Sequence, residues 1–217
     1  ERNITKPRLL IFDWDGTLCD SVEKISSCIR LAAADAGLTV PSRESAADII
    51  GLGLVEATNQ LFPGLDPADA NAFTKLYSRH FREQDKAPCQ FFPGVTETLD
   101  ILKGQGYILA VATGKSRAGL DRVLAAHDMS DYFDGSRCGD ETLSKPNPLM
   151  LNELLDQFSV SSNEALMVGD TEFDLSMAQQ ASMRSIGVNY GAHSKERLEL
   201  YHPIACVDGF SDILKYL

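Results

Sequence analysis

Residues 9–18 read Leu9-Leu10-Ile11-Phe12-Asp13-Trp14-Asp15-Gly16-Thr17-Leu18, an apolar run that ends in two carboxylates and is followed by a glycine. This pattern is typical of a buried strand that opens into a loop. In α/β folds ligands bind beyond the carboxyl ends of the strands, so acids at this position meet a ligand rather than bulk water. On an extended backbone, residues two apart point the same way, which directs Asp13 and Asp15 toward one spot. Two like charges held so close are costly unless a cation or a shared proton offsets them, and that cost is the first indication of function.

The rest of the chain divides into a helical part and a part in which strands and helices alternate. Strands are predicted at 107–112, 135–138, 165–168 and 184–188, the one at 135–138 being short, between helices at 95–105, 117–127, 149–158 and 173–180. Near-continuous apolar strands between helices indicate a parallel sheet that is covered on both faces. Directly after the first strand, helical spacing recurs at 21–36, with Ser21 as the amino-terminal cap, and again at 42–50, 55–61 and 67–84.

We therefore expect an α/β fold with a doubly wound, Rossmann-like parallel sheet. Residues 1–18 and 89–217 form its core domain, and residues 19–88 form an α-helical domain inserted after the first strand. A chain of 217 residues, of which 44% are apolar, is long enough to bury the core that this plan requires.

Charge and composition restrict the partners. The chain carries 20 Lys and Arg residues against 31 Asp and Glu residues, and its net charge of −11 disfavours nucleic acid and anionic membrane surfaces. No apolar stretch approaches the roughly 18 residues of a membrane span, and the amino-terminal residues lack the pattern of a signal peptide. The five cysteines are scattered without CxxC spacing, which favours neither a disulfide framework nor a zinc site. We expect a soluble, cytoplasmic protein with no nucleic-acid or membrane partner, whose oligomeric state is not predicted.

Three further polar segments follow predicted strands. Thr113-Gly114 follows the second strand, Lys145-Pro146 the third, and Gly169-Asp170-Thr171-Glu172-Phe173-Asp174 the fourth. Each has an ordinary interpretation by itself: Thr113 caps the next helix, Lys145 is solvated, and the two aspartates are a helix cap and a first-turn acid. Because all of them lie at carboxyl ends of strands together with Asp13, chance is a poor explanation, and a joint site is favoured.

This set of residues resembles the motifs of the haloacid dehalogenase superfamily of phosphotransferases. Asp13 to Leu18 matches its first motif, Thr113 its second, Lys145 its third, and Gly169-Asp170-Thr171 with Asp174 its fourth. The helical insertion lies where the C1 cap of that superfamily lies. Within the superfamily, the cap length, Phe92-Pro93-Gly94 and Ser144-Lys145-Pro146-Asn147-Pro148 look most like phosphoglycolate phosphatases.

The resemblance implies a magnesium-dependent phosphatase that hydrolyses a small phosphomonoester, phosphoglycolate first among the candidates, through an aspartyl phosphate. A phosphomonoester dianion repels an attacking anion, so a divalent cation has to bridge them, and Mg²⁺ prefers oxygen ligands. The implied protein ligands are Asp13, the backbone carbonyl of Asp15, Asp170, and Asp174 directly or through water. Asp13 would be the nucleophile, and Asp15 would protonate the leaving oxygen and then take a proton from the attacking water.

The remaining implied roles concern phosphate binding. Lys145 adds positive charge beside Asp13, and the Thr113 hydroxyl would bind an oxygen of the transferring phosphoryl group. Backbone N–H groups around Trp14, Asp15 and Gly114 would bind the others.

The inserted helices would act as a cap that excludes bulk water by closing, with hinges at Cys19-Asp20 and at 88–93. Two interpretations of Gly51-Leu52-Gly53 remain open: a loop that reaches the leaving group and sets specificity, or a helix-breaking turn. The four histidines have no metal-ligand spacing and are interpreted as structural residues, and Lys115 and Arg117 as solvated helix residues.

Two rival functions are compatible with these residue types. A phosphomutase of the β-phosphoglucomutase kind shares the catalytic residues and differs mainly in the cap. A receiver-like signalling domain also combines a phosphorylated aspartate with magnesium-binding acids, but it requires neither the helical insertion nor an acid two residues beyond that aspartate.

Overall fold

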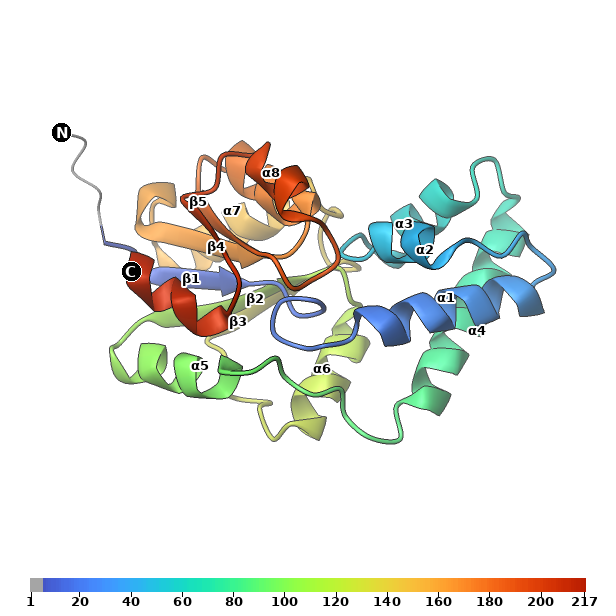
Figure 1. The fold of residues 1–217 in the computed structure, drawn as a ribbon, viewed down its shortest axis with the longest axis horizontal. Coiled ribbons are helices and arrows are strands. Elements are labelled where there is room, and N and C mark those ends of the chain that lie inside the picture. The colour runs from blue at the N-terminus through green and yellow to red at the C-terminus, as the bar shows by residue number, and fades with distance from the viewer. Residues whose placement is uncertain (1–5) are drawn as a thin grey trace.

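The computed structural model describes residues 6–217, so the first five residues of the predicted core domain lie outside the described part. One six-stranded sheet forms the core, in the order β3-β2-β1-β4-β5-β6, with every neighbouring pair parallel (Figure 1). β1 lies in its middle, where Phe12 pairs with Val111 on one side and with Val168 on the other. The strands are β1 (Leu9–Phe12), β2 (Ile108–Thr113), β3 (Gly135–Cys138), β4 (Ala165–Gly169), β5 (Arg184–Val188) and β6 (Ala205–Val207).

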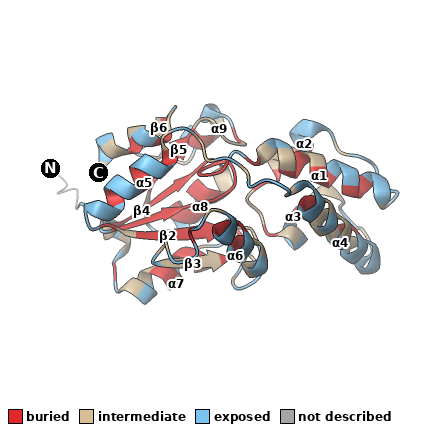
Figure 2. Ribbon diagram, turned by 90° about the horizontal axis from the view of Figure 1, so that it is seen from below, coloured by how far each residue is buried: buried red, intermediate tan, exposed pale blue. Residues whose placement is uncertain are grey.

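The apolar run of β1 is buried because helices cover both faces of the sheet. Side chains alternate along a strand, so Leu10 and Phe12 join the hydrophobic cluster on one face while Leu9 and Ile11 join the cluster on the other. All four are completely buried, as the colouring of Figure 2 shows for the strands as a group. This two-sided burial accounts for the absence of polar alternation in the strand.

Each face has its own set of helices. One face packs against α5 (Val95–Gly104), α6 (Arg117–Ala126) and the 3₁₀ helix η2 (Phe210–Tyr216). The other packs against α7 (Leu149–Phe158) and α8 (Glu172–Gln180). The short elements η1 (Ser162–Glu164) and α9 (Lys195–Glu199) precede β4 and β6.

Between β1 and α5 the chain forms a separate group of helices with its own apolar core, seen at one end of the molecule in Figure 1. Its members are α1 (Val22–Asp35), α2 (Arg43–Asp48), α3 (Leu54–Leu61) and α4 (Pro67–Gln84), which we call the cap. Local signals start the helices: Asp66 Oδ1 accepts the Ala68 N–H at the start of α4, with Pro67 as the first helical residue. Ser42 and Ser116 cap α2 and α6 in the same way.

The expected fold class, a doubly wound parallel sheet with an inserted helical cap, is confirmed. The exact domain boundaries at 18/19 and 88/89 stay a prediction. β6, α9 and η2 had not been predicted, since three to seven residues are too few for a periodic pattern to be visible. Within residues 6–217, none of the helices combines the length and the apolarity that crossing a membrane requires.

Candidate active site

Parallel strands bring the predicted site residues to one edge of the sheet. Asp13 directly follows β1, Thr113 ends β2, and Asp170 directly follows β4. Because β2, β1 and β4 are neighbours and run the same way, their carboxyl ends meet. Lys145 reaches this place from the segment between β3 and α7, and Asp174 reaches it from the first turn of α8.

The Asp13 carboxylate is buried and only half satisfied. Its Oδ1 atom accepts the Trp14 N–H at 2.7 Å and lies 3.0 Å from Lys145 Nζ. Its Oδ2 atom is buried without any hydrogen-bond partner in the described part of the chain. Burial is the main cause that raises the pKa of Asp13 well above its usual value, and the charge of Asp174 raises it further against the effect of Lys145.

Two more carboxylates complete an acidic cluster. Asp170 accepts the Thr17 hydroxyl at 2.9 Å and the Ala192 N–H at 2.8 Å, and burial followed by the charge of Asp174 raises its pKa to about 7. Asp174 Oδ2 accepts the N–H and the hydroxyl of Thr171, which begins α8 as its amino-terminal cap.

Lys145 is the cation that opposes this cluster. Its Nζ atom donates to Asp174 Oδ1 at 2.7 Å, and its side chain is completely buried. Burial acts against the ammonium form, but the carboxylates of Asp13 and Asp174 outweigh it and raise the pKa of Lys145. The ordinary alternative, a solvated lysine, is therefore wrong.

The residues present fit a divalent cation. One carboxylate oxygen from each of Asp13, Asp170 and Asp174 lies within 4.8 Å of the other two. Three buried carboxylates face a single ammonium, so negative charge is left uncompensated, and the unpartnered Oδ2 of Asp13 offers a free ligand. Oxygen-only donors of this kind suit Mg²⁺.

Asp15 is held apart from that cluster by partners of its own. Its Oδ1 atom accepts the Ser21 hydroxyl at 2.7 Å, and its Oδ2 atom lies 3.2 Å from Lys115 Nζ. Ser21 does occupy the amino-terminal cap position of α1, but its hydroxyl bonds Asp15 rather than the helix. The interpretation of Lys115 as a solvated residue is wrong, because its side chain is 11% exposed and its ammonium lies 4.6 Å from the centre of the Phe81 ring.

The predicted phosphate-binding groups lie at the same carboxyl edge of the sheet. Thr113 Oγ1 accepts the Lys115 N–H at 3.1 Å, and the alternative that Thr113 caps the next helix is wrong, because Ser116 caps it. The Trp14 N–H is already engaged by Asp13, and the Trp14 indole is buried. The phosphate-binding role of these groups stays a prediction.

Two glycines allow the close approaches that the site needs. Gly16 has a φ of +78°, and a Cβ atom there would lie 2.1 Å from Asp170 Oδ2. A Cβ atom on Gly114 would lie 2.4 Å from the carbonyl oxygen of Leu52 in the cap. The loop of Gly51-Leu52-Gly53 therefore rests directly on the carboxyl end of β2.

Polar contacts hold the cap against the core. The Gly53 N–H donates to Ser144 Oγ at 2.9 Å. On the other side of the loop, His193 Nε2 lies 2.9 Å from the carbonyl oxygen of Asp48, and Arg197 forms an ion pair with the Asp48 carboxylate. His193 Nδ1 accepts the backbone N–H of Glu172, so its ring orientation is fixed at both nitrogens. The structure thus shows the cap seated on the site.

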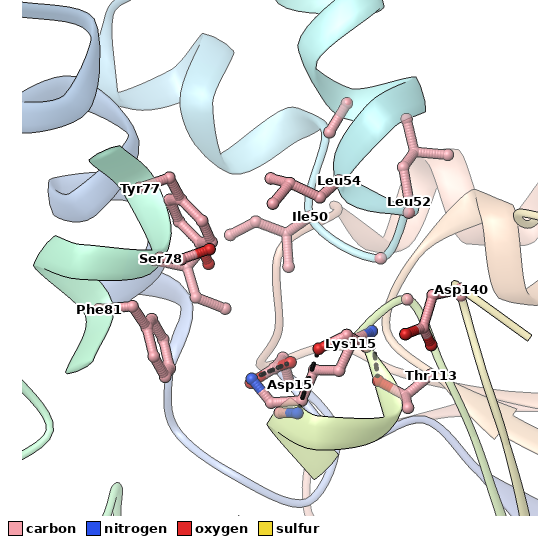
Figure 3. A pocket seen from close by; sticks show the side chains of 18 of the residues that line it. Asp15, Ile50, Leu52, Leu54, Tyr77, Ser78, Phe81, Thr113, Lys115 and Asp140 are labelled. Atoms are coloured by element: carbon pink, nitrogen blue, oxygen red, sulfur yellow. Dashed lines mark hydrogen bonds and ion pairs between the residues drawn. The ribbon is translucent and has the colours of Figure 1, made fainter. Parts of the chain in front are cut away.

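Cap and core enclose a cavity of about 420 Å³ over the carboxyl edge of the sheet. Asp13, Asp15 and Thr113 line its floor, and side chains of the cap line its walls. Figure 3 shows Asp15, Lys115 and Thr113 below the hollow, with Tyr77 and Phe81 of α4 beside it. A ligand in this cavity has direct access to both acids of the first motif.

Three comparisons place the chain among known proteins. The family model of haloacid dehalogenase-like hydrolases matches residues 10–188. A Dickeya dadantii protein named "Probable phosphatase IndB" is 38% identical over 210 residues, which cover 95% of this chain and 91% of that protein. A phosphoglycolate phosphatase of Aliivibrio fischeri is 33% identical over 218 residues, covering 97% and 94%. The crystal structure of a predicted phosphoglycolate phosphatase from Haemophilus somnus has a TM-score of 0.84 at 29% identity, covering 99% of both chains.

Proposed function

We propose a mechanism for this chain, which belongs to the haloacid dehalogenase-like hydrolase family and is a phosphatase. Asp13 is the nucleophile and Asp15 the general acid and base in the hydrolysis of a phosphomonoester. The observation that carries the proposal is the Oδ2 atom of Asp13, which is buried without a hydrogen-bond partner in a residue that lines the cavity. A carboxylate oxygen in that state is available either to a cation or to a phosphorus atom.

Asp13, Asp170 and Asp174 would hold Mg²⁺. When bound, the ion offsets the charge of these acids and of the phosphate, so that an anionic nucleophile can approach an anionic substrate. Lys145 would add positive charge to the same acids, because its ammonium lies 3.0 Å from Asp13 Oδ1 and 2.7 Å from Asp174 Oδ1.

The first step transfers the phosphoryl group to Asp13. An oxygen of its carboxylate forms a bond to phosphorus while the ester P–O bond breaks, and the leaving oxygen takes the proton of Asp15. In the second step, water attacks the phosphorus and Asp15 takes its proton. The bond between Asp13 and phosphorus breaks, which releases inorganic phosphate and restores both acids.

The contacts around Asp15 suit a group that acts twice. The Ser21 hydroxyl and the Lys115 ammonium fix one oxygen each, at 2.7 Å and 3.2 Å, so the carboxyl group keeps its place between the two steps. The seated cap keeps bulk water from Asp13 and the bound phosphomonoester during the first step.

Phosphate release from a substrate panel tests this proposal. The relatives named as phosphoglycolate phosphatases make phosphoglycolate its first member, followed by sugar phosphates, nucleotides and pyridoxal phosphate, each with and without Mg²⁺. We expect magnesium-dependent release from wild-type protein and none from Asp13→Asn protein that is folded. Release that survives Asp13→Asn would overturn the nucleophile assignment, and isomerisation of a sugar phosphate without release would indicate a mutase.

We also propose that the protein works in the cytoplasm. All five cysteines are free thiols, of which Cys19, Cys28 and Cys138 are buried. Free thiols persist in a reducing compartment.

A further inference from the structure

The cavity is roomy even though the cap is seated. Its volume is about 420 Å³, while Gly114 leaves no space for a methyl group beside Leu52 and the Gly53 N–H bonds Ser144. The volume is therefore not a gap left by an open cap. Cavities of roughly 300–1,000 Å³ hold ligands the size of drugs. A leaving group of two carbon atoms would leave most of this cavity unfilled.

The part of the cavity wall that the cap contributes is mainly apolar and aromatic. Tyr77 and Phe81 project from α4 on one side, and Ile50 and Leu54 project from the opposite side, while Asp15 lies below (Figure 3). Aromatic and aliphatic surfaces that face each other across a hollow are suited to a flat ring, which packs against both.

The cations of the lining are paired or peripheral. Lys115 is 3.2 Å from Asp15, and the Arg122 guanidinium is 3.4 Å from Asp85. Arg82 is exposed to solvent. A second anionic group on the substrate would lose its hydration against Ile50 and Leu54, and the buried cation of the lining, Lys115, is already paired with Asp15, which is unfavourable. The walls therefore select against a carboxylate in the leaving group.

One polar group of the wall remains available. The Tyr77 hydroxyl has no hydrogen-bond partner among residues 6–217, although its side chain lines the cavity. Tyr77 is half-buried and its hydroxyl is free to bond a ligand, so a polar edge of the ligand is the group that this hydroxyl would bind.

We propose that the substrate is the phosphomonoester of an alcohol that bears an uncharged flat ring, with the size of a nucleoside or a pyridine alcohol. The ring packs against the aliphatic side chains of Ile50 and Leu54, and its polar edge meets Tyr77. This inference rests on the proposed phosphatase mechanism and gives the leaving group a ring in place of a two-carbon acid.

Steady-state phosphate release by the full chain with Mg²⁺ tests the inference. The probes are a nucleoside monophosphate, pyridoxal phosphate and phosphoglycolate. We expect kcat/KM for one of the two ring substrates to exceed that for phosphoglycolate by at least about 10²-fold, and the comparison of the two identifies the ring. A higher kcat/KM for phosphoglycolate overturns the inference and leaves the phosphatase mechanism standing. Release from none of the probes overturns both.

Variants of α4 locate the ring. Ser78 is half-buried and faces the hollow, so Ser78→Trp fills the ring space and should lower kcat/KM for the ring substrate at least about tenfold more than for phosphoglycolate. Lys75→Trp adds the same side chain on the exposed side of the helix and should not change that ratio. Equal losses for both substrates in Ser78→Trp protein contradict the placement. If kcat/KM for phosphoglycolate exceeds that for both ring substrates and is lost in Arg82→Ala protein, Arg82 at the edge of the cavity binds a carboxylate of the substrate, contrary to the inference.

Discussion

Replacing Asp13 by asparagine should make the metal-free protein more stable while it abolishes turnover. The amide has nearly the same shape as the carboxylate and keeps an oxygen for the Trp14 N–H and for Lys145. It removes one negative charge from a buried cluster whose acids raise one another's pKa. The activity loss should be roughly 10⁴-fold or more, as for other enzymes that lose their nucleophile.

The pH dependence of the stability gained by Asp13→Asn follows from the direction in which the pKa values of the buried acids are shifted. A carboxyl group with a raised pKa binds a proton in the folded state that the unfolded state has already lost, so it lowers stability as the pH rises above about 4. For Asp170 the rise from 3.8 to about 7 corresponds to about 4 kcal/mol once the pH exceeds 7, at 1.36 kcal/mol per pKa unit. Asp13 is shifted in the same direction by burial and by the same neighbour, Asp174.

We therefore expect Asp13→Asn to raise the free energy of unfolding by about 1–4 kcal/mol near pH 8 without Mg²⁺. The difference should shrink as the pH falls and vanish only well below the usual pKa of 3.8, where the wild-type acid is protonated in both states. Thermal melts with EDTA at several pH values measure it, at about 2–4 °C per kcal/mol for a chain of this length. Asp131→Asn, at an exposed position, is the matched control.

Addition of Mg²⁺ completes the experiment. The ion should raise the Tm of the wild-type protein strongly and that of Asp13→Asn protein much less, because one ligand oxygen has lost its charge. Without metal at pH 8, the Asp13→Asn protein should melt at a higher temperature than the wild type. An equal or lower melting temperature would refute the idea that repulsion among the buried acids destabilises the metal-free protein.

Three further perturbations test other parts of the site. Lys145→Met should lower the free energy of unfolding by about 3–5 kcal/mol in melts at pH 8, because it leaves two buried carboxylates without their cation. A second substitution in the same chain, Asp174→Asn, should restore part of that stability without restoring phosphate release. Purely additive losses in the double variant would contradict the pairing. Gly114→Ala should prevent seating of the cap and lower kcat roughly 10²-fold with an unchanged Tm, whereas Gly104→Ala, where a Cβ meets nothing within 4 Å, should leave kcat intact. Titration calorimetry should show that Mg²⁺ binds more tightly as the pH rises from about 6 to about 8, because the ion has to displace a proton from Asp170, whose pKa is about 7; an affinity independent of pH in that range would exclude this competition.

The sequence predicted the central part of the site because its geometry follows from the sheet. Thr113 ends β2, Asp13 and Asp170 directly follow β1 and β4, and adjacent parallel strands bring such positions together whatever the loops do. The family predicted from the four motifs is confirmed. The clustering of Asp13, Asp170 and Asp174 follows from the same arrangement.

Contacts that depend on the path of a loop were not predicted. Ser21 reaches Asp15 only because residues 16–20 turn back on themselves, and no local pattern reports such a turn. The ion pair of Asp48 with Arg197 joins positions that are 149 residues apart, and each residue alone resembles a solvated surface charge. The sequence did hint at Lys115, because this lysine directly follows the Thr113-Gly114 motif. Its amphipathic side chain is, however, compatible both with the site and with the solvent-exposed surface.

Trp14 gives the site an optical property. It is the single tryptophan of the chain, and it stands between the two acids of the first motif. Its indole packs edge-on against Phe91 and Phe133, with ring centres 5.7 Å and 6.3 Å away, while its backbone N–H bonds the Asp13 carboxylate. Any shift of the Asp13 loop therefore changes the surroundings of the only indole. Its ultraviolet fluorescence is an intrinsic reporter, present without any label, through which events at the nucleophile can be timed in a stopped-flow instrument.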